Sequence, residues 1–215
     1  ATGDAEWYVH APVKPPEVAE VVREEAGTIE MVLPGDDRST PSRGAEFERD
    51  AGRVFEPVMR QRRAFGSAVH AVFENIAWLD PANPPVWDDV DPAVKEHVTA
   101  CLASLEVALL LQRPTIPHEL WREQSFEMVL NGRWVSGVFD RVVVVRDEAG
   151  NPVSVDIIDF KTNHIDDPAA IMEHAEPYRS QLETYRSVIE RIVGLSSEKI
   201  RMLLVFTGLG RVVEL

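Results

Sequence analysis

The first regular hydrophobic pattern in the chain is helical. From residue 65 to residue 79, apolar side chains recur three or four positions apart, which is the spacing of one helix face, and Asp80-Pro81 ends the run. A second helix is predicted to start at Asp91-Pro92, a capping residue followed by proline, and to continue to about Gln112. The two patterns predict a pair of amphipathic helices.

Beyond residue 125 the pattern changes to the alternation of strands. Phe126, Met128 and Leu130 alternate with polar residues, and Asn131-Gly132 is a strong hairpin signal. The order helix, helix, three strands, helix, strands predicts an α/β (α+β) domain with a mixed sheet. Further strands are predicted over 134–145, 153–161, 201–207 and 211–215, and a helix closed by Gly194 over 177–193.

The first fifty residues differ from the rest. They are rich in proline and hold 12 acidic and five basic residues, half of the net charge of −14. We expect residues 1–50 to be an acidic, proline-rich linker or appendage and residues 51–215 to be one domain; the alternative is an extra layer packed on that domain. Because the chain begins at Ala1, we also expect a piece of a longer protein.

Composition narrows the class of protein. A lone cysteine, Cys101, excludes an internal disulfide and a four-cysteine zinc or iron–sulfur site. No apolar run approaches the roughly 18 residues of a membrane span, and no signal peptide opens the chain. We therefore expect a cytoplasmic protein without a membrane partner. The acidic balance alone argues against nucleic acid, but bulk charge says little about one surface.

The strand at 153–161 ends in a charged pair. Side chains alternate faces along a strand, so Asp159 and Lys161 project to the same side. A strand end is where open α/β sheets carry their sites. The simplest alternative is a structural salt bridge within the strand.

Asp140 interrupts the apolar run of the preceding strand. A carboxylate among valines needs a partner or a metal ion. Two adjacent strands can place it beside Asp159, and magnesium suits a pair of carboxylates. The alternative is a structural pair with Arg141 or another arginine.

Two helices carry further polar candidates. His70 lies beside the apolar stripe of the first helix, where a histidine is usually a hydrogen-bonded boundary residue. Gln181 and Tyr185 share one face of a later helix, flanked by Arg179 and Arg186. That face is either a polar rim or a contact surface for a phosphodiester backbone.

Five short motifs occur in order: GSAVH (Gly66–His70), the glutamate of WREQSF (Glu123), GVFD (Gly137–Asp140), DFKTN (Asp159–Asn163) and YRSQLETY (Tyr178–Tyr185). Together they resemble the PD-(D/E)xK nuclease superfamily, specifically the nuclease domains of RecB- and AddA-type helicase–nucleases. The resemblance covers about residues 60–215. It implies a restriction-endonuclease-like fold, a mixed central sheet flanked by helices.

The resemblance also implies a role for each matching residue. Asp140 and Asp159 match the metal-binding acids, Lys161 the catalytic lysine, and His70 an added metal ligand of this branch. Phe160 stands where tyrosine is more usual and would offer its backbone carbonyl to the metal. The implied cofactor is Mg²⁺, with Mn²⁺ as a substitute.

Other matches concern the substrate. Gln181 and Tyr185 match a helix motif near the DNA backbone, with Arg179 and Arg186 as neighbouring donors, and Glu123 matches a recurrent acidic position to which the resemblance assigns no role. Arginines at positions 60, 62 and 63, which we expect just before the His70 helix, are further candidates for a DNA track.

We therefore expect a metal-dependent deoxyribonuclease, exonuclease rather than endonuclease, acting on single-stranded or unwound DNA in repair or recombination. No G-x-x-x-x-G-K loop is present, so a helicase motor would be covalently linked or lie in a partner subunit. The alternatives are a catalytically inactive DNA-binding or structural module, and a nuclease that acts on RNA.

Overall fold

The computed structural model describes residues 38–39, 56–80, 84–87, 89–165 and 167–215. Of the predicted linker or appendage over 1–50, only Arg38–Ser39 falls within these ranges, and the remainder lies outside the described residues. The division into residues 1–50 and 51–215 therefore stays a prediction.

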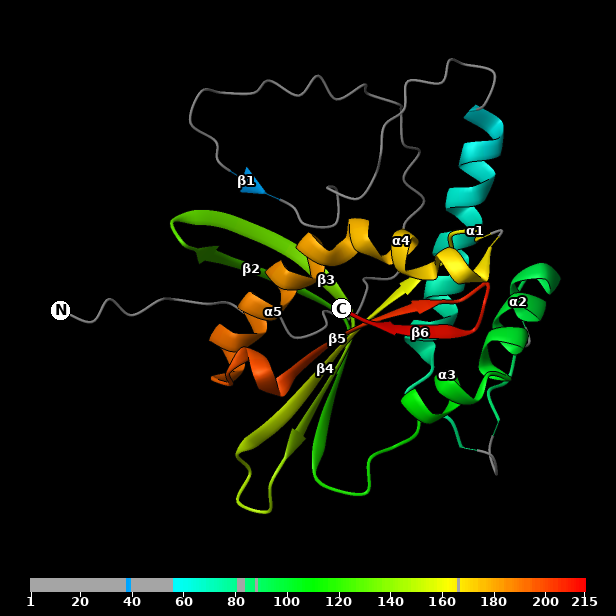
Figure 1. Ribbon diagram of the computed structural model, residues 1–215. Coiled ribbons are helices and arrows are strands. Elements are labelled where there is room, and N and C mark those ends of the chain that lie inside the picture. Colours follow the sequence, from blue (N-terminus) through cyan, green and yellow to red (C-terminus); the bar gives the residue numbers. More distant parts are fainter. Residues whose placement is uncertain (1–37, 40–55, 81–83, 88, 166) are drawn as a thin grey trace, which may run out of the picture.

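The described strands form one mixed sheet (Figure 1). Its order is β1-β3-β4-β5-β6, and β2 pairs with β3 along the whole hairpin, so β1 and β4 share the opposite edge of β3. β4 and β5 are parallel, whereas β3 is antiparallel to β2 and to β4. This sheet and its flanking helices confirm the predicted α+β class. The strands are β1 (Arg38–Ser39), β2 (His118–Leu130), β3 (Arg133–Arg146), β4 (Pro152–Lys161), β5 (Ile200–Phe206) and β6 (Arg211–Glu214).

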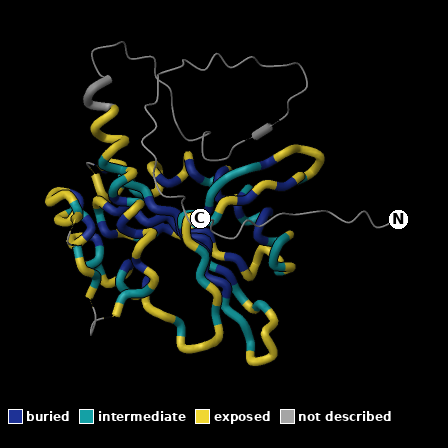
Figure 2. Tube along the Cα trace, turned by 180° about the vertical axis from the view of Figure 1, so that it is seen from behind, coloured by how far each residue is buried: buried dark blue, intermediate teal, exposed yellow. Residues whose placement is uncertain are grey.

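Helices cover both faces of the sheet. Along β4, Ile157 packs with α5 on one face and Ile158 packs with α1 and α2 on the other, as expected of neighbouring residues in a strand. The buried positions therefore run along the central strands, between two helical layers (Figure 2). No described helix has the length and apolar content needed to cross a membrane. The helices are α1 (Glu56–Asn75), α2 (Pro92–Leu102), α3 (Leu105–Leu110), α4 (Ile171–Ala175) and α5 (Arg179–Val193), with single 3₁₀ turns at Pro168–Ala170, Glu176–Tyr178 and Ser197–Lys199.

The prediction of one helix from Asp91 to Gln112 is wrong, because the segment is divided into α2 and α3. Ser104 is extended between them, with φ −68° and ψ 130°. The break turns α3 toward β6, where Glu106 accepts hydrogen bonds from the Val212 amide at 3.0 Å and from Arg211 Nε at 3.2 Å. A contact with a strand a hundred residues later overrides the local helical pattern.

Strand β2 begins at His118, eight residues before the predicted start at Phe126. Its first half mixes exposed charged residues with half-buried ones without regular alternation, and β3 is its only partner among the described strands. Polar side chains on an exposed edge hide the period-two signal. The hairpin turn at Asn131-Gly132 is confirmed by the pair Leu130–Arg133.

Helix α1 ends at Asn75, four residues before its predicted end at residue 79. Arg141 stabilises the chain just beyond this helix end. Its side chain is 1% exposed, and Nη1 donates to the Ile76 carbonyl at 2.8 Å while Nη2 donates to the Ala77 carbonyl. The guanidinium also lies 4.8 Å from the Trp78 ring centre. Burial, with a smaller contribution from Arg122, lowers the pKa of Arg141 to about 10. The side chain stays charged at neutral pH and satisfies two carbonyls that follow the helix.

We expect Arg141→Ala to lower the free energy of unfolding by about 3 kcal/mol, because it leaves these two carbonyls without their donor. Urea denaturation would measure the change. Arg146→Ala on the same strand is the control: it removes an exposed ion pair with Glu119, N–O distance 2.9 Å, and should cost less than about 1 kcal/mol. Equal losses for the two variants would contradict the assignment.

Candidate functional site

Three acidic residues lie at one level across three neighbouring strands. The ladder between β3 and β4 ends at the pair Arg141–Ile158, and the next residues along the two strands are Asp140 and Asp159. On the other side of β3, Glu123 lies between residues paired with Arg141 and Phe139, which brings it level with Asp140. The sheet therefore gathers Glu123, Asp140 and Asp159 where the β3–β4 ladder opens.

Glu123 has an unusual backbone for a strand residue. Its φ is +45°, in the left-handed region that non-glycine residues seldom occupy. Such strain persists only where the surrounding structure imposes it, and it concentrates at functional sites.

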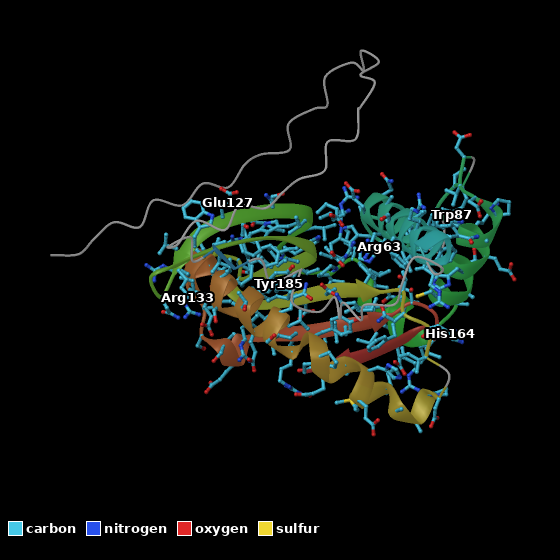
Figure 3. The ribbon with its side chains drawn as sticks, turned by 90° about the horizontal axis from the view of Figure 1, so that it is seen from above. Arg63, Trp87, Glu127, Arg133, His164 and Tyr185 are labelled. Atoms are coloured by element: carbon cyan, nitrogen blue, oxygen red, sulfur yellow. The ribbon has the colours of Figure 1, made fainter. Side chains whose placement is uncertain are left out.

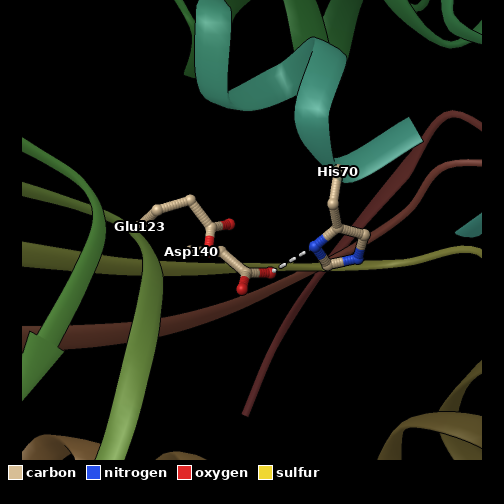
Figure 4. Close-up of side chains that lie close together, drawn as sticks. All are labelled: His70, Glu123 and Asp140. Atoms are coloured by element: carbon tan, nitrogen blue, oxygen red, sulfur yellow. Dashed lines mark ion pairs between the residues drawn. The ribbon is translucent and has the colours of Figure 1, made fainter. Parts of the chain in front are cut away.

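His70 on α1 completes a cluster with two of these acids (Figure 4). His70 Nδ1 lies 3.4 Å from Asp140 Oδ2, and ligand atoms of His70, Glu123 and Asp140 all lie within 4.8 Å of one another. A cavity of about 560 Å³ opens beside them between α1 and the sheet. Its lining residues are Arg63, Gly66, Ser67, His70, Ala71, Glu74, Glu123 and Asp140.

The close approach of α1 to the sheet depends on Gly66. A Cβ atom at this position would lie 3.0 Å from Thr162 Oγ1, just beyond the end of β4. Glycine therefore lets the helix cross close to the strand end, and His70, one turn later, faces the acids.

Asp140 is held by the neighbouring strand and, within the described part of the chain, not by an arginine. Its Oδ2 accepts a hydrogen bond of 2.8 Å from the Phe160 amide, while Arg141 binds carbonyls at the end of α1. The alternative of a structural Asp140–Arg141 pair is therefore wrong.

Asp159 and Lys161 lie in contact, as the two-residue spacing predicts. Lys161 Nζ is 2.6 Å from Asp159 Oδ2 and 4.3 Å from the centre of the Tyr178 ring. Asn163 Nδ2 donates to the Tyr178 hydroxyl at 2.7 Å. The pair is not among the residues that line the cavity, so these contacts hold the lysine beside the acidic cluster and not inside it.

The ionisation of the cluster reflects crowded negative charge. Burial first, and then the carboxylate of Asp159, hold the pKa of Asp140 well above its usual range, although the Phe160 amide and Lys161 oppose this. Burial also raises the pKa of Glu123, with help from Glu74 and Asp159. Negative charge therefore outweighs positive charge around Asp140 and Glu123.

The two basic groups shift in opposite directions. Burial lowers the pKa of His70, and Lys161 contributes to the decrease, although Asp159 opposes it. Burial acts to lower the pKa of Lys161 as well, but the attraction and hydrogen bond of Asp159 outweigh it, so the pKa is raised. At neutral pH the imidazole is neutral, the form that binds metals, and the lysine is a cation.

This donor set fits a divalent cation. Carboxylate oxygens suit Mg²⁺ and Mn²⁺, and a neutral imidazole adds a nitrogen ligand. A cation among Glu123, Asp140 and His70 would also offset the crowded negative charge that helps to raise the pKa values of the two carboxyl groups.

The residues predicted to contact DNA occupy different environments. Gln181 and Tyr185 are buried on α5, 6% and 1% exposed. Arg179 forms an ion pair with exposed Glu176, N–O distance 2.9 Å, and Arg186 is half-buried. The arginines at 60, 62 and 63 lie within α1 and not before it, because the helix begins at Glu56. Figure 3 shows Tyr185 of α5 and Arg63 of α1 on separate elements.

The family model of the PD-(D/E)XK nuclease superfamily matches residues 45–213. The chain belongs to this superfamily. No curated protein matches the sequence. The match includes every candidate site residue from His70 to Arg186, and the mixed sheet with its flanking helices is consistent with the restriction-endonuclease-like fold.

PD-(D/E)XK nucleases use divalent metals, and among the described residues the cluster of His70, Glu123 and Asp140 offers suitable ligands. The sequence alone left the role of Glu123 open. The signal that locates it is the hairpin turn: a two-residue loop at Asn131-Gly132 pairs positions equally distant from the turn, and Glu123 and Asp140 are each eight residues away.

Proposed function

We propose that this protein is a Mg²⁺- or Mn²⁺-dependent deoxyribonuclease that hydrolyses phosphodiester bonds in single-stranded or unwound DNA, as an exonuclease. The observation that supports this proposal best is the juxtaposition of a His–Glu–Asp cluster with the Asp159–Lys161 pair in a member of a nuclease superfamily.

In this proposal His70, Asp140 and Glu123 hold the metal. The family resemblance adds Asp159 and the Phe160 carbonyl as ligands. Asp159 acts electrostatically on His70, Asp140 and Glu123, which supports a place beside the same ion.

The metal, when bound, would lower the pKa of a water molecule and stabilise charge on the phosphate. Lys161 supplies a fixed positive charge that orients the attacking water and offsets negative charge that develops on the phosphoryl oxygens. Asp159 keeps that ammonium charged and in place through the 2.6 Å contact. Tyr178 limits its movement through the cation–π contact.

The decisive experiment supplies labelled single-stranded DNA, duplex DNA and RNA with Mg²⁺ or Mn²⁺. We expect cleavage of single-stranded DNA with either metal and none after EDTA. Release of mononucleotides or short products from an end would support exonuclease action. Absence of cleavage on every substrate would favour the inactive DNA-binding module, and cleavage of RNA alone would favour a ribonuclease.

Arg63 is the best-placed contact for the DNA backbone. It is exposed, and it is the only arginine or lysine among the described residues that line the cavity. Seven residues, or about 10 Å of helix, separate it from His70, so it would meet a phosphate beside the one at the metal. Arg62 is also exposed but does not line the cavity.

We expect Arg63→Ala to raise KM for an oligonucleotide about three- to tenfold and to reduce the slope of log affinity against log salt by about 0.7, the value for one lost phosphate contact on a single strand. Arg62→Ala changes the net charge equally and should have a much smaller effect on both. Equal effects would show that only overall charge matters.

We further propose that the domain works attached to a helicase motor, in repair or recombination, as the RecB- and AddA-type resemblance implies. With a net charge of −14, the chain should attract DNA weakly, and a tethered motor would deliver the strand at high effective concentration. Residues 1–50 would serve as the tether. Tight binding of this chain to DNA at physiological salt, measured by fluorescence anisotropy, would contradict this dependence.

A further inference from the structure

We infer that Gln181 and Tyr185 are positioning residues that hold the Asp159–Lys161 pair in place, and that they do not contact DNA. The inference rests on the proposed nuclease function and assigns these two side chains a task different from the one that the family resemblance implies.

The first observation is the contact that Tyr185 makes at the opening between β3 and β4. Beyond the pair Arg141–Ile158, the Phe160 amide donates to the Asp140 side chain and not to a carbonyl of β3. On β3, the Val138 carbonyl instead accepts a hydrogen bond of 2.8 Å from the Tyr185 hydroxyl. Tyr185 therefore stabilises the backbone of β3 two residues before Asp140, at a position where β3 is not paired with β4.

The second observation is the direction of the hydrogen bonds. A carbonyl only accepts, so the single proton of the Tyr185 hydroxyl is used on Val138, and the hydroxyl must accept from Gln181 Nε2 at 3.0 Å. The same nitrogen lies 3.4 Å from Asp159 Oδ1, a carboxylate that only accepts. Both neighbours require the NH₂ end of the amide, and Gln181 Oε1 is left buried without a hydrogen bond.

Both carboxylate oxygens of Asp159 are contacted by other side chains. Gln181 contacts Oδ1 while Lys161 Nζ contacts Oδ2 at 2.6 Å. The carboxylate is thus fixed between α5 and the lysine, and Gln181 reaches back through Tyr185 to the strand of Asp140. We call the hydrogen bonds that run from Asp159 through Gln181 and Tyr185 to Val138 the relay. The relay connects β4 and β3, the strands that carry Asp159 and Asp140, to helix α5.

Burial argues against the alternative of a DNA contact. Tyr185 is 1% exposed and is enclosed by the rings of Phe126 and Phe139, with centroids 5.7 and 5.0 Å away. The Tyr185 hydroxyl donates its proton to Val138, so it has none left to donate to a phosphate outside. Gln181 Nε2 already contacts the Tyr185 hydroxyl and the Asp159 carboxylate.

The test is Gln181→Glu, which keeps the shape of the side chain but replaces the donor with a second carboxylate facing Asp159. We expect kcat to fall about 10- to 100-fold, the loss typical of a group that orients a ligand. KM for a single-stranded oligonucleotide should stay within about twofold, because binding energy is unaffected. Ser180→Glu, an exposed neighbour on α5, adds the same charge and should leave kcat within about twofold.

Tyr185→Phe tests the other end of the relay and removes only a hydroxyl. We expect kcat to fall about three- to tenfold, the equivalent of one net hydrogen bond, again without a change in KM. This variant keeps the packed ring, so it remains informative if Gln181→Glu fails to fold; thermal denaturation would reveal that failure.

Opposite outcomes would overturn the inference. A rise in KM with kcat retained, in either variant, would show that the residues bind DNA. Unchanged kcat in both variants, with an active wild-type enzyme, would show that the relay has no role and would leave the proposed nuclease function intact. A wild-type protein that cleaves nothing would instead refute the proposed function, and the inference with it.

Discussion

Lys161→Ala should abolish cleavage while Mn²⁺ binding survives. The ammonium is expected to act on the water and the phosphate and not as a metal ligand, because a lysine cation has no lone pair to donate. Loss of one preorganised charge beside the reacting phosphate should lower kcat by about 100- to 1,000-fold. Calorimetric titration with Mn²⁺ should find an affinity within a few-fold of the wild type.

Lys95→Ala is the matched control, since it removes an exposed lysine of α2 and the same unit of charge. It should leave kcat unchanged. If Lys161→Ala loses Mn²⁺ as completely as a variant of the acids, the division of roles is wrong and the lysine is needed to build the metal site.

Asp140→Asn should abolish both metal binding and cleavage, and still fold. Asparagine can accept the hydrogen bond from the Phe160 amide, so the local backbone keeps its partner. Without the carboxylate, Mn²⁺ affinity should fall by more than the roughly 10- to 100-fold that loss of an outer-shell partner costs. His70→Ala should weaken Mn²⁺ binding less, since it removes one neutral ligand.

Without metal, Asp140→Asn should be no less stable than the wild type. Because folding raises the pKa of Asp140, this carboxyl contributes most to stability at low pH and loses that contribution as the pH rises through its folded pKa. Asparagine carries no charge at any of these pH values, so the gain should be greatest at neutral pH. Urea denaturation at pH 5 and pH 8 would show it; a large loss of stability at pH 8 would contradict a crowded anionic site.

Three kinds of pattern in the sequence are local and carry reliable information. The hairpin turn at Asn131-Gly132, the helix closed by Gly194 and the Asp159–Lys161 spacing each depend on a few neighbouring residues, and each is present in the fold. Turn chemistry, capping and strand alternation are properties of short segments, so no distant contact is needed to impose them.

The length of elements at the margins depends on contacts made elsewhere. The predicted helix over 91–112 is divided because Glu106 binds the backbone of β6. The early start of β2 is set by pairing with β3, and the predicted helix over 65–79 ends early where Arg141 takes two carbonyls. In each case a partner far along the chain outweighs the local hydrophobic pattern.

The predictions about the site also divide into those that follow from short motifs and those that depend on the tertiary structure. Motifs alone single out His70, Asp140, Asp159 and Lys161 as candidate metal ligands and a candidate catalytic lysine, because such residues are recognised by type and order. Motifs do not reveal which side chains touch. Glu123 joins His70 and Asp140 only because hairpin register and the crossing of α1 bring ligand atoms of the three side chains within 4.8 Å of one another. Gln181 reaches Asp159 and Tyr185 reaches the Val138 carbonyl because α5 packs against the sheet, and packing against a surface built from distant strands is a property of the tertiary structure alone.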